Sequence, residues 1–167
     1  MRPLTPDIQT FLLRDLDALR REVNLFPDDE MLWTEPDGIT NPAGILVLHG
    51  CGNLRHFIGG VLTGSGYIRD RPAEFESRGL SRDELKGIIA ETKEELLAAF
   101  AVIDESVRDT TFPVQIGGVD VNTQRFLIHL CTHLAFHVGQ LGYLRRLLTG
   151  DNVSSGAIPV KVLAEES

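Results

Sequence analysis

The stretch TQRFLIHLCTHLAFHVGQLGYLRRLLTG, residues 123–150, carries the clearest structural signal in the chain. Its large apolar residues recur at steps of three, four and seven, which is the spacing of one face of an α-helix. Gly150 follows them and is typical of a helix C-terminus. The pattern predicts a helix from Asn122 or Thr123 to Leu148. Its apolar positions are Phe126, Leu130, Leu134, Leu141, Leu144 and Leu148.

Three further segments upstream show helical spacing. They cover residues 5–25, 42–63 and 81–106, and loops are predicted between them at 24–41 and 64–80. The second segment is rich in glycine, which weakens an isolated helix. We therefore expect close packing or a nearby ligand to compensate for these glycines.

Local motifs mark the starts of these elements. Ser81 followed by Glu84 is a capping-box pattern, and Thr40 with Pro42 provides a capping side chain and a proline suited to a first turn. Residues 111–121 form two short alternating runs around a Gly-Gly pair, which predicts a small β-hairpin. We also expect Trp33 to anchor the first loop to the core.

Four substantial helices with one short hairpin predict an all-α protein, specifically a four-helix bundle forming a single domain over residues 1–167. The two long connections leave the order and direction of the helices open on this basis alone.

The composition excludes several classes of partner. A net charge of -8 without a basic stripe argues against nucleic acid. No run approaches the roughly 18 consecutive apolar residues of a membrane span, so no membrane is expected. The N-terminal sequence lacks the pattern of a secretion signal, which favours the cytoplasm. Two cysteines are too few for a disulfide framework and are expected to be reduced.

All five histidines fall in two of the predicted helices. His133 and His137 are four residues apart and project from nearly the same face, so they can share one ion. His129 also lies on that face, but it is about 12 Å along the axis from His137, which is too far for the same ion. The pair therefore needs a third ligand from another helix.

The third ligand comes from the second predicted helix. His49 follows the apolar run Ile45–Leu48, whereas His56 follows Arg55 nearer a polar boundary. We expect His49 to be the ligand, and His56 is the alternative. Three neutral imidazoles suit Zn, Ni, Fe or Cu and leave positions open on the ion. The competing interpretation is that each histidine is a core residue with a satisfied hydrogen bond.

Two strings carry a family resemblance: HGCGNLRHFI, residues 49–58, and HLAFHVGQ, residues 133–140. With the helix spacing and the predicted hairpin, they make the chain resemble the DinB-like superfamily, also called DinB/YfiT-like, over most of its length. The resemblance implies an up-down-down-up four-helix bundle and a homodimer. It also implies a metal site of His49, His133 and His137 that holds nickel, zinc or iron.

Several relatives of that superfamily are thiol-dependent transferases or isomerases. The resemblance therefore implies a low-molecular-weight thiol and a small-molecule substrate. One departure is Val138, where many relatives have arginine, and it could alter contacts beside the site. The glutamate of a His-Glu-x-x-His protease is also missing, because Leu134 follows His133.

Other polar residues near the histidines are candidates for binding the cofactor or substrate. Asn53 and Gln140 lie within one helical turn of His49 and His137, and Arg55 could pair with an anionic thiol. Hydrogen bonds between helices and a surface salt bridge are the simpler explanations. We expect Cys51 and Cys131 to be packing residues. Asp15, if turned inward, could support a ligand.

These observations predict a metal-dependent thiol S-transferase or isomerase. The alternatives are a metal-dependent hydrolase and a non-catalytic, stress-associated dimer in which the ion holds two helices together.

Overall fold

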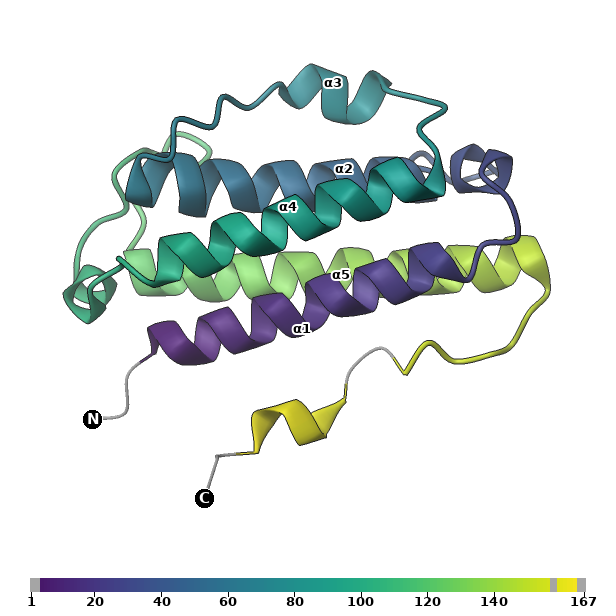
Figure 1. Cartoon of the computed structure of the whole chain (residues 1–167). Helices are drawn as coiled ribbons and strands as arrows, with labels where there is room; N and C mark the ends of the chain where they lie inside the picture. The colour runs from purple at the N-terminus through teal and green to yellow at the C-terminus, as the bar shows by residue number, and fades with distance from the viewer. Residues whose placement is uncertain (1–3, 157–158, 165–167) are drawn as a thin grey trace.

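The computed structural model describes residues 4–156 and 159–164, and within them the chain is mostly helical, without a β-sheet. This confirms the all-α prediction. In Figure 1 the four long helices lie side by side, with α1 and α5 running in one direction and α2 and α4 in the other. Their bounds are Thr5–Asn24 for α1, Ala43–Leu54 for α2, Arg82–Phe100 for α4 and Thr123–Thr149 for α5.

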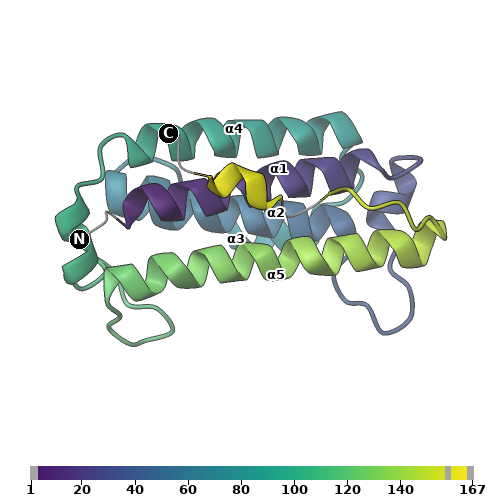
Figure 2. The ribbon, with the colours of Figure 1, turned by 90° about the horizontal axis from the view of Figure 1, so that it is seen from below.

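The core lies between these four helices. Both α1 and α2 contact α4 and α5, so α1 and α2 occupy opposite corners. Figure 2 shows α1 in front of α2, with α4 and α5 on either side. Leu12, Leu16, Leu96 and Leu134 are completely buried, as helical apolar faces require. After α5, a short 3-10 helix, Val160–Leu163, contacts α1.

The helix termini follow their capping residues. Ser81 and Glu84 form the predicted capping box of α4. The Asn122 side chain accepts a hydrogen bond from the backbone N–H of Arg125 at the start of α5. Gly150 ends α5 with φ 68°, a left-handed conformation that favours glycine.

The second helix differs from the sequence prediction in two details. Thr40 does not cap it, since Pro42 occupies the N-cap position without a side-chain hydrogen bond. The predicted single helix also changes hydrogen-bonding pattern at residue 55 and continues as a π-helix, Arg55–Leu62. By length and mean hydropathy, 1.2, residues 43–62 could cross a membrane, but 56% of the apolar window is buried inside the protein. The packing of α2 against α4 and α5 accounts for that apolar character.

Glycines of this helix allow close packing, as expected. A Cβ atom on Gly44 would overlap the Trp33 ring, and one on Gly52 would overlap the Glu74 carboxylate. The Trp33 indole also donates a hydrogen bond to the Leu80 carbonyl at 2.8 Å. Trp33 therefore holds the first loop against the protein, as the sequence predicted.

Both predicted loops contain short helices. Residues 24–41 include a 3-10 helix, Glu30–Trp33. Residues 64–80 include α3, Arg71–Glu76, which contacts α2 and lies on its outer side (Figure 1). The absence of α3 from the sequence prediction matters most, because this helix carries a residue of the candidate site.

The segment between α4 and α5 also differs from the prediction. Helix α4 ends at Phe100 instead of near residue 106, and a 3-10 helix, Glu105–Asp109, follows it. The expected hairpin is reduced to two isolated bridges, Thr111–Asn122 and Ile116–Val119.

Candidate metal centre

Three histidines converge between α2 and α5. His49 comes from α2, and His133 and His137 come from successive turns of α5. The Nε2 atom of His133 lies 3.3 Å from Nε2 of His49 and 3.1 Å from Nε2 of His137. We refer to these residues as the histidine trio.

The spacing of the trio fits a shared metal ion. Two nitrogens that each lie about 2.0–2.1 Å from one zinc ion are about 3 Å apart. Both distances from His133 Nε2 match that value, and the candidate ligand atoms of the trio all lie within 4.8 Å of one another.

The outer ring nitrogens of two members of the trio are held by neighbours. Nδ1 of His49 lies 3.0 Å from Oε2 of Glu74, and Nδ1 of His137 lies 2.7 Å from Oε1 of Gln140. Since both partner oxygens accept, we assign the proton to Nδ1 in each ring. The lone pair is then on Nε2, which faces the centre of the trio.

Glu74 is itself held by an arginine. Arg69 Nε donates to Oε1 at 2.6 Å, and one terminal nitrogen donates to Oε2 at 2.7 Å, which is a bidentate pair. Burial raises the pKa of Glu74, but the hydrogen bonds from Arg69 and His49 outweigh it and lower the pKa below its ordinary value. Glu74 is therefore an anion beside His49 at neutral pH.

The sequence analysis missed Glu74 and Arg69. Asp70 caps α3 by accepting from the backbone N–H of Ala73 at 3.0 Å, and Pro72 lies in its first turn. The Asp-Arg-Pro string was thus a helix-start signal in a segment predicted as loop. Gly52 was the second signal, since its missing side chain leaves space for Glu74.

His133 and His137 are neutral at physiological pH. Burial, with the neighbouring His137 and His49, lowers the pKa of His133 to about 4. Burial also lowers the pKa of His137, although its bond to Gln140 opposes this. Neutral imidazole is the form that binds a metal ion.

The other two histidines lie outside the trio. His56 contacts Phe57 edge to face at 4.7 Å between ring centroids. His129 is exposed and stacks on Phe126, with ring centroids 5.8 Å apart. Of the two histidines in residues 43–62, His49 and not His56 therefore lies beside His133 and His137.

The three candidate binding residues have different surroundings. Gln140 bonds to His137, as described above. Arg55 is paired with Glu95, with 3.0 Å between Nε and Oε2, and lies over the Tyr67 ring. Asn53 is 9% exposed, and its buried Oδ1 has no hydrogen-bond partner among the described residues. Because of its salt bridge with Glu95, the guanidinium of Arg55 already has an anionic partner.

Among the described residues, the cysteines and Asp15 make no hydrogen bond, ion pair or ring contact with the trio. Burial raises the pKa of the Cys51 and Cys131 thiols to about 12, so neither is a thiolate at neutral pH. Asp15 is turned inward, but it accepts a hydrogen bond from Arg14 at 2.8 Å.

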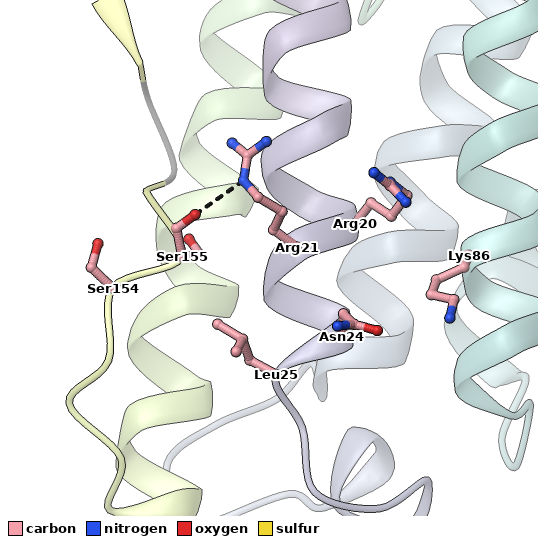
Figure 3. A pocket seen from close by; sticks show the side chains of 7 residues that line it. All are labelled: Arg20, Arg21, Asn24, Leu25, Lys86, Ser154 and Ser155. Carbon is pink, nitrogen blue, oxygen red and sulfur yellow. Dashed lines mark hydrogen bonds between the residues drawn. The ribbon is translucent and has the colours of Figure 1, made fainter.

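A cavity of about 250 Å³ opens beside the trio, with Ile45, Phe75 and Phe136 among its lining residues. Another cavity, of about 350 Å³, lies along α1 and shares no lining residue with it. Figure 3 shows this second cavity, where Arg21 donates to the Ser155 carbonyl at 3.0 Å. Arg20 and Lys86 also line it.

Comparison with known proteins gives a family without an assigned activity. No curated protein and no solved structure matched the chain. A family model described as "Protein of unknown function (DUF1572)" matches residues 10–161, which is most of the chain. The chain therefore belongs to the DUF1572 family.

Proposed function

We propose that this chain is a metal-dependent enzyme of the DinB-like superfamily, a thiol S-transferase or isomerase acting on a small molecule. The observation that carries the proposal is the convergence of three histidine Nε2 atoms. In two of these rings the other nitrogen, Nδ1, is hydrogen-bonded, to Glu74 and to Gln140. The opposed directions of the helix pairs in Figure 1 support the up-down-down-up bundle of that superfamily.

The side chains suit this chemistry. Three neutral imidazoles would hold nickel, zinc or iron and leave coordination positions for a thiol. A bound divalent ion lowers the pKa of a coordinated thiol and so makes it a nucleophile at neutral pH. Gln140 and Glu74 orient two of the rings, and the cavity beside Phe75 and Phe136 would receive the electrophile.

A thiol is favoured over water as the nucleophile because, among the described residues, Glu74 is the only carboxylate that contacts the trio. Both oxygens of Glu74 already accept hydrogen bonds from Arg69, and Oε2 also contacts His49. Glu74 is therefore poorly placed to take a proton from water. A thiol has less need of a base, since its ordinary pKa is about 8.5.

We place this enzyme in the cytoplasm as a homodimer. The net charge of -8 keeps it from nucleic acid, and reduced cysteines suit that compartment.

The test is metal analysis of the purified protein, with an assay for conjugation of low-molecular-weight thiols to electrophiles. Wild type should hold about one ion per chain, and His133→Ala should lose both the ion and turnover. His49→Ala should lose the ion, whereas the matched variant His56→Ala should retain it. Stoichiometric metal without turnover would favour the non-catalytic dimer, and a wild type without first-row metal would overturn the proposal.

A further inference from the structure

A third cavity lies next to the one beside the histidine trio. This third cavity has a volume of about 440 Å³ and lies between residues 38–41 and the C-terminal third of α5. Asn41 and Leu46 line both cavities. The two therefore adjoin, and we refer to them together as the α5 groove.

One wall of the α5 groove is a single face of α5. His137, Gln140, Tyr143 and Leu147 line it at steps of three and four residues. At about 1.5 Å per residue, this wall extends roughly 15 Å from the trio. That length accommodates an extended chain rather than a compact group.

The lining of the α5 groove carries no formal charge apart from histidines. Lys, Arg, Asp and Glu make up 24% of the chain, yet none is among the described residues lining either cavity. An ionic group on the tail would lose hydration against these side chains without gaining a charged partner, which is costly. The groove therefore favours a neutral ligand.

We propose that the α5 groove binds the apolar tail of a neutral substrate, whose reactive group lies at the trio. This rests on the proposed function, since the trio supplies the chemistry. The substrate class is a neutral molecule with a linear alkyl portion extending up to about 15 Å from its reactive end. Leu46 and Leu147 contact the tail, and Gln140 lies beside the reactive end.

A second copy of the chain is the competing occupant, because Tyr143 and Leu147 are 78% and 67% exposed. The small molecule is favoured by two observations. The third cavity shares the lining residues Asn41 and Leu46 with the cavity beside the trio. Its volume is also of the size that small ligands fill.

The test uses straight-chain 1-alkanols of increasing length, because they are neutral and coordinate metal ions weakly. Their dissociation constants would be measured by ligand-observed NMR on the full-length, zinc-supplemented protein. Affinity should rise about fourfold per added methylene and then stop rising when the chain reaches the end of the groove. In Leu147→Asp the rise should stop at a shorter chain, with at least a tenfold loss for the longest alkanol.

The matched control is Leu97→Asp, an exposed leucine on α4 that lines none of the described cavities. It should bind every alkanol as wild type does. Bound zinc and the oligomeric state would be measured on all three proteins. Zinc content should be unchanged in both variants.

Several outcomes would overturn the groove proposal. Affinity independent of chain length would do so, and so would equal effects of the two substitutions. A change of oligomeric state in Leu147→Asp with unchanged alkanol affinity would show that the face joins two copies. If the zinc-supplemented wild type took up no metal while the length series persisted, the metal-dependent enzyme would be overturned and the groove proposal would stand.

Discussion

Nδ1 of His49 donates a hydrogen bond to Oε2 of Glu74 across 3.0 Å, and this contact joins α2 to α3. Glu74 is 6% exposed and also accepts two hydrogen bonds from Arg69. A carboxylate in this position fixes the ring orientation and increases the basicity of Nε2. Glu74 is thus a positioning residue for the trio.

Glu74→Gln should lower metal affinity by about tenfold to about 100-fold, because the carboxylate behind His49 is lost. Competition with a chromophoric chelator would measure the dissociation constant. Glu76→Gln, an exposed position on the same helix, is the control and should bind metal as wild type does. Equal affinities for Glu74→Gln and wild type would show that this contact does not support the site.

Gly52→Ala should weaken metal binding without touching a histidine. The new methyl group would overlap the Glu74 carboxylate and push α3 away from α2. Gly87→Ala is the control, because nothing lies within 4 Å of its added carbon, and it should stabilise α4 by up to about 1 kcal/mol. Urea unfolding and metal titration of both variants would check this. A Gly52→Ala protein as stable as Gly87→Ala would contradict the close approach.

Arg145→Met should lower the free energy of unfolding by about 3–5 kcal/mol. The Arg145 and Glu22 side chains are 0% and 2% exposed, with 2.6 Å between Nε and Oε2, so removing one partner leaves a buried charge. The double variant Arg145→Met/Glu22→Leu should recover part of this loss. Urea denaturation of the three variants would measure it. A double variant less stable than Arg145→Met would argue against an uncompensated charge as the cause.

Glu105→Gln should destabilise the protein at neutral pH and have little effect near pH 2. The carboxylate accepts hydrogen bonds from the backbone N–H groups of Leu4 and Thr5, which lower its pKa from 4.5 to about 2. A depressed folded-state pKa stabilises the protein above pH 4.5, and this contribution is lost as pH falls toward 2. Melting temperatures of both proteins across that range should converge. A difference that stays constant with pH would mean that the charge of Glu105 is irrelevant.

Cys51 and Cys131 should react slowly with thiol reagents at pH 8 in the folded protein. Burial raises the pKa of both to about 12, which keeps them protonated. Labelling followed by mass spectrometry, with and without denaturant, would measure the difference. Rapid labelling of either thiol in the folded protein would contradict its assignment as a packing residue.

The accuracy of the sequence prediction depended on how local each signal was. The start of α1, the capping box of α4 and the Gly150 end of α5 were located within a residue or two, because each is set by neighbouring side chains. The end of α4 was placed too late, since apolar spacing continued past Phe100 into a turn. The predicted hairpin is not confirmed, since the segment around the Gly-Gly pair forms two isolated antiparallel bridges and a turn alone does not ensure a paired ladder.

By itself, the sequence determined the long helices, their buried faces and the pairing of His133 with His137, because a period of 3.6 residues fixes all three locally. The apolar run before His49 favoured it over His56, but only the tertiary structure decided that its Nε2 atom reaches His133 and that Glu74 stands behind it. The physical reason is that α3 has six residues, fewer than the roughly 12 that an isolated helix needs, so it forms through its contacts with α2.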